Sequence, residues 1–173
     1  YAPLAHRLGT AWVKSELEDL ALKYLHPEVY YQLKRNVAKK KTDREKYIEE
    51  VISIIGKKLE AEGIDAEVTG RSKHFYSIYQ KMESQNLLYD QIYDLVAFRI
   101  LVDTPRECYE TLGVVHAQWK PVPTRFKDYI ALPKPNMYQS LHTTVIGPYG
   151  ERIEIQIRSH EMHRVAEESI AAH

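Results

Sequence analysis

The sequence predicts an α+β fold with helices flanking a β-sheet, and three stretches of the 173 residues carry this prediction. Residues 153–158 alternate strictly between isoleucine and polar side chains, which is the pattern of a strand with one apolar face. Residues 93–102 form a hydrophobic run typical of a strand buried on both faces. Apolar side chains recur at helical spacing between Ile48 and Leu59, so residues 43–62 are predicted to form an amphipathic helix.

The first 41 residues are predicted to be helical and to form a unit separate from residues 42–173. The segment from Trp12 to Leu25 is periodic. Pro27 suits the first turn of a second helix, which we expect to end in the lysine run 39–41 as a solvated end, although this run is also a candidate contact for a phosphate or a partner.

The helix over 43–62 has signals at both of its ends. Thr42 and Glu45 fit a capping box at its start, and Gly63 is the stop signal. From Asp65 onward the pattern changes to short strands and helices, which marks the start of the predicted sheet.

A short strand over 66–69 runs into Gly70 and is followed by a predicted helix through Met82. Its apolar residues Phe75, Ile78, Tyr79 and Met82 share one face, which we expect to pack on the sheet. Lys73, Ser77 and Lys81 share another face, beside Arg71 at the mouth of the helix. These residues make either a solvated helix face or a binding site for a polyphosphate at a helix N-terminus.

The hydrophobic run contains two charged residues, Asp94 at its start and Arg99 within it. A charge in such a run is costly unless it is paired or functional. Asp94 is read as either a cap or a metal ligand, and Arg99 as either an ion-pair partner or a site residue. Strict alternation places them on opposite faces, so they serve one site only if Asp94 precedes the regular strand.

Residues 140–146 and 153–158 are predicted to form a hairpin. A four-residue turn pairs His142 with Ile155 and mixes polar with apolar side chains. A five-residue connection, 147–151, instead pairs Thr144 with Glu154, His142 with Gln156 and Ser140 with Arg158. We predict the second register, because it gives one polar and ionisable face. A purely structural hairpin does not need such a face.

The loop before this hairpin combines cations with an aromatic ring. Arg125, Lys127 and Lys134 crowd around a proline-rich loop that leads through Asn136 to Tyr138. The loop is either simply solvated, with a packing tyrosine, or a nucleotide site in which cations meet phosphates and the ring meets a base.

The remaining helices carry little visible chemistry. Pro105 opens a predicted helix through Gln118, and Cys108 in it is interpreted as a buried structural thiol. Ser159 is expected to cap a last helix through Ala172. His160 and His163 lie one turn apart there, but they lack the spacing of a zinc-binding helix.

Composition excludes several classes of function. Twenty-four basic and 24 acidic side chains give a formal charge of zero, so no global polycation draws the chain onto nucleic acid. The one cysteine excludes an internal disulfide framework and suits a reducing compartment, so we expect a cytoplasmic protein. We expect no membrane partner, because no apolar run approaches the ~20 residues of a membrane span.

Four motifs in order resemble the synthetase domain of the RelA/SpoT-homologue alarmone enzymes. They are GRSKHFYSIYQKM (70–82), YDLVAFRI (93–100), RFKDYIALPKPNMYQSLHTTV (125–145) and IEIQIR (153–158). The resemblance implies a nucleotidyltransferase-like mixed β-sheet flanked by helices, with an N-terminal helical segment. It also implies transfer of pyrophosphate from ATP to the 3′-OH of GDP or GTP, in the stringent response. YAPLAHRLG (1–9) resembles the last helix of the hydrolase domain in long members. Residues 1–41 are therefore expected to be the tail of such a domain, and ribosome or regulator contacts to lie in absent domains.

The resemblance also implies roles for single residues. Asp94 and Glu154 are expected to bind Mg²⁺, with Glu154 also the base for the 3′-OH. For ATP, the implied residues are Arg71 and Arg99 on the adenine and Lys73, Ser77 and Lys81 on the phosphates. For the acceptor, they are Tyr138 stacking on guanine, His142, Asn136 and Gln156 supporting it, and Arg125, Lys127 and Lys134 near the phosphates. The basic motif that begins at Arg125 implies a preference for GDP.

One departure from the family pattern and two competing functions remain. Many members have glycine where this chain has Met137, which restricts the loop or covers the base. A catalytically silent nucleotide-binding or regulatory module of the same fold is the first alternative. An RNA-binding domain is the second, because tyrosines lie beside lysines, but carboxylates on the polar face of the hairpin oppose it.

Overall fold

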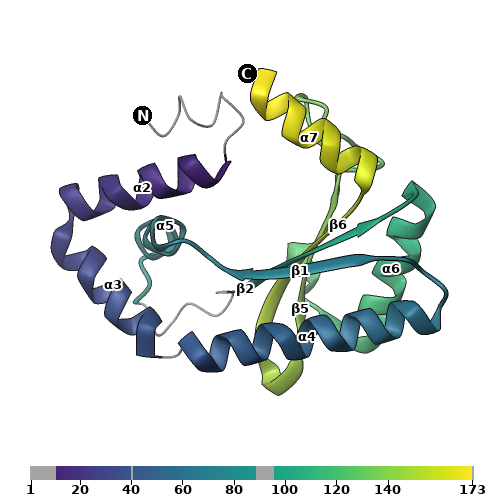
Figure 1. Cartoon of the computed structure of the whole chain (residues 1–173), viewed down its shortest axis with the longest axis horizontal. Coiled ribbons are helices and arrows are strands. Elements are labelled where there is room, and N and C mark those ends of the chain that lie inside the picture. The colour runs from purple at the N-terminus through teal and green to yellow at the C-terminus, as the bar shows by residue number, and fades with distance from the viewer. Residues whose placement is uncertain (1–10, 40, 89–95, 173) are drawn as a thin grey trace.

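A computed structural model of the chain describes residues 11–39, 41–88 and 96–172 (Figure 1). The helices are α2 (Ala11–Leu25), α3 (Pro27–Lys39), α4 (Lys41–Ala61), α5 (Phe75–Gln85), α6 (Pro105–Gln118) and α7 (His160–Ala172). The strands are β1 (Glu67–Ser72), β2 (Val96–Val102), β3 (Lys120–Pro121), β4 (Lys127–Asp128), β5 (Leu141–Ile146) and β6 (Arg152–Ser159). Two short 3₁₀ turns, η2 (Pro123–Arg125) and η3 (Pro148–Gly150), complete the described elements. The predicted α+β class is confirmed.

The strands form one mixed sheet in the order β1-β2-β6-β5-β3, with β4 pairing with β5 beside β3. The central pair β2 and β6 is parallel, and the other pairs are antiparallel. Strands β3 and β4 were not predicted from the sequence, because they have two residues each and therefore no periodic pattern.

The hairpin of β5 and β6 has the predicted register. Thr144 pairs with Glu154 and His142 with Gln156, across a connection of residues 147–151. Ile153, Ile155 and Ile157 are all buried on the opposite face. We call the side that carries Glu154 and Gln156 the polar face of the sheet.

The main core fills the other face of the sheet, under α4 and α6. Val51, Ile55 and Leu59 of α4 are buried against it, as the predicted period requires. Cys108 of α6 is fully buried, as predicted, and burial raises the pKa of its thiol to about 12. Figure 1 shows α4 running along this face of the sheet and α6 beside the far end of α4.

Strand β1 extends further than predicted. It continues through Gly70 and Arg71 to Ser72, because this stretch pairs with β2. Gly70 is therefore not a turn residue. It pairs with Phe98, and a Cβ at Gly70 would lie 2.6 Å from Cε1 of the Phe98 ring. The glycine makes room for a large side chain in the core.

Helix α5 also departs from the prediction in its start and its packing. It begins at Phe75, so Lys73 lies before the helix and not on it. Its apolar face does not pack on the sheet. Ile78 is buried with Leu22 of α2 and Leu33 of α3, in a second cluster that Phe75 joins. In Figure 1, α2, α3 and α5 gather at one end of the molecule. The division of the chain near residue 41 stays a prediction.

Smaller differences concern the ends of elements and the exposure of β2. Helix α4 begins at Lys41, so Thr42 lies inside it and not at its N-cap. Gly63 ends that helix in a left-handed conformation, as predicted. The prediction of a strand buried on both faces was wrong at Ala97 and Arg99, which are only half-buried on the polar face, and is confirmed at the other five residues of β2. Within the described ranges, no helix is long and apolar enough to cross a bilayer.

Candidate active site

The register of the strands aligns predicted site residues in rows across the polar face. The central row runs, strand by strand, through Thr69, Arg99, Gln156, His142 and Lys127. The next row contains Arg71, Ala97, Glu154 and Thr144. Residues far apart in the sequence therefore share one surface, and cations are concentrated there although the chain is neutral.

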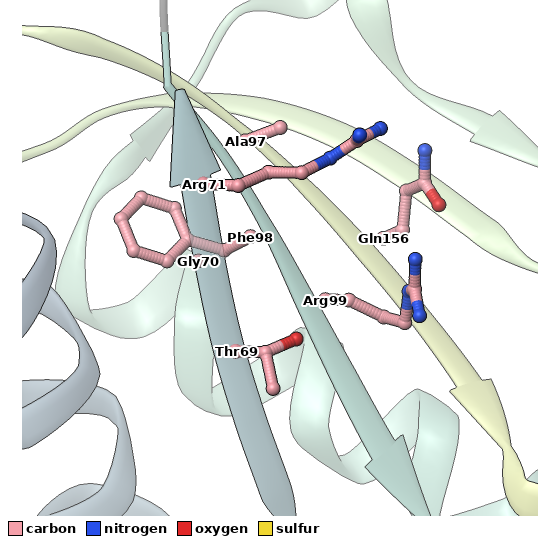
Figure 2. A pocket seen from close by; sticks show the side chains of 7 residues that line it. All are labelled: Thr69, Gly70, Arg71, Ala97, Phe98, Arg99 and Gln156. Atoms are coloured by element: carbon pink, nitrogen blue, oxygen red, sulfur yellow. The ribbon is translucent and has the colours of Figure 1, made fainter. Parts of the chain in front are cut away.

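Arg71 and Arg99 line a pocket of about 150 Å³ together with Gln156 (Figure 2). Figure 2 shows their three side chains reaching out on the polar face, while the ring of Phe98 points to the core. Burial and the nearby charge of Arg99 lower the pKa of Arg71. Two guanidinium groups around one small pocket suit an electron-rich planar group such as an adenine ring.

Arg71 is held in place by a neighbour that the sequence analysis did not single out. Its Nη1 atom lies 2.8 Å from Nε2 of His74. Arginine has only donors, so this ring nitrogen is the acceptor. Burial, with the charge of Arg71, lowers the pKa of His74, which agrees with a neutral ring.

Lys73 and Glu154 form an ion pair at the edge of the polar face. The Nζ atom of Lys73 lies 2.8 Å from Oε1 of Glu154, and both side chains keep partial contact with solvent. This contact joins the segment before α5 to strand β6. A predicted phosphate ligand and the predicted base are therefore neighbours, which the sequence positions alone did not show.

Tyr138 and His142 form the second half of the site. The Tyr138 hydroxyl lies 2.7 Å from Nε2 of His142, and the ring of Tyr129 meets both rings edge-on. Burial, with the charges of Arg158 and Lys134, lowers the pKa of His142 to about 4, so the ring is neutral at pH 7. Lys134 Nζ lies 5.3 Å from the centroid of the Tyr138 ring, as predicted for a cation beside an aromatic.

The loop before Tyr138 is a tight turn. The Met137 N–H donates to the carbonyl of Lys134, and the Lys134 N–H donates to the carbonyl of Tyr138. Oδ1 of Asn136 accepts from the Tyr138 N–H at 3.2 Å, so this side chain shapes the loop. Met137 has a φ of 69° and is exposed, in a conformation that glycine adopts without strain. The conformation gives a physical reason for glycine at this position.

Arg158 is the main site residue that the sequence analysis missed. It is buried, its guanidinium carbon lies 5.5 Å from the centroid of the Tyr138 ring, and its Nη2 donates to Oε1 of Gln156 at 2.9 Å. The sequence analysis placed Arg158 on the polar face without a role. Its position on the same strand face as Glu154 and Gln156 is the sequence signal that could have identified it as a site residue.

The structure does not bring every predicted residue into these contacts. Ser77 and Lys81 lie one turn apart on α5, and the described residues that line the pocket around Arg71 all belong to β1, β2 and β6. Arg125 is exposed at the end of η2. Lys127 is exposed on β4, where it pairs with His142 of β5. Asp94 lies outside the described residues, so its predicted place beside Glu154 stays a prediction.

The two histidines at the start of α7 each lie beside one carboxylate. His160 lies 3.9 Å from Asp103 and His163 lies 4.0 Å from Glu167, one carboxylate for each ring. The described ranges contain no group of three or more metal-ligating side chains.

Comparison with solved structures identifies the fold. Small alarmone synthetase 2 of Bacillus subtilis is 27% identical over 76% of this chain and 74% of its own, with a TM-score of 0.56. Small alarmone synthetase 1 of the same organism, solved with its product pppGpp, is 24% identical over 78% of this chain and 76% of its own, also with a TM-score of 0.56. The chain therefore has the fold of the small alarmone synthetases.

The family follows from the sequence match. Residues 70–173 match the model described as the region found in RelA / SpoT proteins. The chain belongs to this family. Two relatives named GTP pyrophosphokinase, from Myxococcus xanthus and Escherichia coli K12, are 58% and 48% identical over all of this chain. A relative in Aquifex aeolicus, 50% identical, is named guanosine-3′,5′-bis(diphosphate) 3′-pyrophosphohydrolase. The chain spans about a quarter of these relatives' length, 23% to 25%.

Proposed function

We propose that this chain is a (p)ppGpp synthetase domain, which transfers pyrophosphate from ATP to the ribose 3′-OH of GDP or GTP in the stringent response. The relatives named GTP pyrophosphokinase match it over its whole length. We further propose that it works in the cytoplasm, and that the longer parent contacts the ribosome or regulators through other domains.

The observation that carries the proposal is that strand β6, which bears Glu154, runs between two different sites. On one side lie the guanidinium groups of Arg71 and Arg99, and on the other lie Tyr138 and His142. Gln156 lies two residues after Glu154 on β6 and pairs with Arg99 on β2 and with His142 on β5. A donor and an acceptor bound at the two sites would meet over β6.

The two sites suit different parts of the reaction. Arg71 and Arg99 take the adenine of ATP, and Lys73, with Ser77 and Lys81 from α5, takes its phosphates. Tyr138 stacks on the guanine of the acceptor, supported by His142, Asn136 and Gln156. Lys134 beside the Tyr138 ring and Lys127 beside His142 lie on the acceptor side, and with the exposed Arg125 they suit its phosphates.

In the transfer, the 3′ oxygen of the acceptor forms a bond to the β-phosphorus of ATP. The bond from that phosphorus to the bridging α–β oxygen breaks, and AMP leaves. Glu154 accepts the proton of the 3′-OH, and the nearby lysine and arginine side chains stabilise the charge on the phosphates.

The donor set at Glu154 fits a magnesium ion. Its carboxylate is partly exposed beside the proposed phosphate site, and hard oxygen ligands are those that Mg²⁺ prefers. Glu154 together with Asp94 would hold the ion. When bound, Mg²⁺ supplies charge neutralisation at the phosphates.

The test is to incubate the chain with ATP, GDP and Mg²⁺ and to separate the nucleotides by ion exchange. We expect ppGpp and AMP in equal amounts. Glu154→Gln is expected to lower turnover by about 10²- to 10⁴-fold while ATP binding persists. Glu151→Gln, in the exposed turn of the same hairpin, is the matched control and should act like the unaltered chain.

Two other results would replace the proposal. Nucleotide binding without product, from folded protein in the presence and absence of added flanking domains, would indicate a silent regulatory module. Salt-sensitive and magnesium-independent binding of RNA in a filter assay would indicate an RNA-binding domain.

A further inference from the structure

We propose that Arg158 is a positioning residue for the acceptor, which fixes both the ring of Tyr138 and the amide of Gln156. The inference rests on the proposed function for the meaning of the acceptor site. The two contacts themselves are properties of the ligand-free chain. Arg158 does not need to touch either nucleotide to act in this way.

The first contact sets the plane of the stacking ring. Two cations lie near the Tyr138 ring, Arg158 at 5.5 Å and Lys134 at 5.3 Å from its centroid. Arg158 is only 6% exposed and sits on β6, whereas Lys134 is exposed on a loop. When a base arrives, Lys134 can leave the ring for the phosphates, and Arg158 stays in place.

The second contact sets the direction of the Gln156 amide. Arginine carries only donors, so the side-chain atom of Gln156 that faces Nη2 of Arg158 must be its oxygen. The amide NH₂ group of Gln156 then points away from Arg158 and can serve as a donor on the polar face, where Gln156 lies between Arg99 and His142. A donor here matches the acceptor atom O6 of guanine and does not match the amino group that adenine carries at the same position, whereas N7 is an acceptor in both bases.

The cost of burying Arg158 supports a role beyond stability. Burial lowers the pKa of this guanidinium, and its Nε atom has no hydrogen-bond partner among the described residues. Buried ionic groups can often be replaced by apolar ones without loss of stability. The charged side chain at this position is therefore better explained by what it holds than by the packing it supplies.

The experiment compares Arg158→Met and Arg158→Lys with Arg152→Met, an exposed arginine on the same strand. Calorimetry measures the dissociation constants of GDP and of a non-hydrolysable ATP analogue. We expect Arg158→Met to weaken the binding of GDP at least about tenfold and the binding of the ATP analogue less than about twofold. Arg158→Lys should fall between, since it keeps the charge and one donor. Arg152→Met should leave both constants unchanged.

A second readout needs no ligand. The charge of Arg158 helps to lower the pKa of His142, so the NMR titration of His142 should move upward from about 4 in Arg158→Met and not in Arg152→Met. The shift shows that the charge of Arg158 acts on the acceptor site of the folded chain, and the dissociation constant of GDP shows whether Arg158 positions the acceptor. If Arg158→Met does not fold, the dissociation constant of GDP measured for Arg158→Lys decides whether Arg158 positions the acceptor.

The outcomes separate this inference from the proposed function. The positioning role would be overturned if Arg158→Met weakened the binding of GDP and of the ATP analogue equally. It would also be overturned if the dissociation constant of GDP were unchanged in folded Arg158→Met or Arg158→Lys. An unchanged His142 titration in Arg158→Met would overturn it as well. A chain that shows the His142 shift and the selective loss of GDP binding but makes no ppGpp would retain the inference and lose the synthetase proposal.

Discussion

Nζ of Lys73 lies 2.8 Å from Oε1 of Glu154, so the ligand-free chain pairs its proposed phosphate ligand with its proposed base. The pair holds the segment before α5 against the central strand β6. Under the proposed function, the phosphates of a bound ATP would offer Lys73 a second anionic partner and would free the carboxylate for the acceptor. We interpret this ion pair as a resting arrangement of the two groups.

Replacing Lys73 by methionine is expected to weaken ATP binding about tenfold, the loss of one charge-assisted contact to a phosphate. GDP binding should change by less than about twofold, because Lys73 lies on the donor side. The measurement is a calorimetric titration with a non-hydrolysable ATP analogue. Lys57→Met, an exposed position on α4, is the control. Unaltered ATP affinity in folded Lys73→Met would remove Lys73 from the donor site.

The low pKa of His142, about 4 against 6.5 in the unfolded chain, predicts a loss of stability in acid. Below pH 6.5 His142 binds a proton in the unfolded state but stays neutral in the folded state. The free energy of unfolding therefore falls as the pH falls toward 4. The loss from this group is on the order of 2 kcal/mol, reduced by its partial contact with solvent.

Urea unfolding at pH 7 and at pH 4.5 checks this expectation. His142→Gln offers Tyr138 another hydrogen-bond acceptor but does not titrate, so its stability should depend less on pH than that of the unaltered chain. Identical pH profiles for the two proteins would show that His142 does not titrate abnormally.

Gly70→Ala is expected to destabilise the fold by about 1–3 kcal/mol, because the new Cβ meets the ring of Phe98 and Cγ2 of Ile48 within 3 Å. Chemical unfolding measures the change. Gly113→Ala in α6 is the matched control, since no side chain or neighbouring element among the described residues comes within 4 Å of its Cβ and alanine favours a helix. A neutral Gly70→Ala would mean that β1 can shift away from β2 at little cost.

Asp19→Ala is expected to cost about 1 kcal/mol, because Oδ1 of Asp19 on α2 accepts from the Tyr76 N–H at the start of α5. The N-cap residue His74 makes no side-chain cap bond of its own. Asp19→Asn keeps an acceptor and should cost less, since burial already raises the pKa of the carboxyl and disfavours its charge. Thermal unfolding of both variants provides the comparison.

The elements that local pattern determines were predicted well. The period-two pattern of Ile153, Ile155 and Ile157 gave β6 and, with the polar residues of β5, the register of the hairpin. Helix α6 has the predicted bounds, since Thr104 and Pro105 mark its start chemically. Ser159 caps α7 as expected, through the Met162 N–H.

What failed depended on contacts between distant segments. Gly70 has the local character of a turn residue, and only its pairing with Phe98 makes it a strand residue. The apolar face of α5 indicated burial without indicating the partner, which is Leu22 and Leu33 and not the sheet. Arg158 was placed on the correct face, but its contact with the Tyr138 ring requires the folded loop before β5, whereas its bond to Gln156 spans only two residues of β6.

The parallel alignment of β2 with β6 has a consequence for how the chain folds. Ala97 and Glu154 are partners although 57 positions separate them, and α6 with all of β3, β4 and β5 lies in between. Closing so long a loop costs entropy before any contact repays it, so this junction is expected to form late and to slow the folding rate. A nascent chain released before β6 would carry the arginines of the pocket but not the carboxylate opposite them.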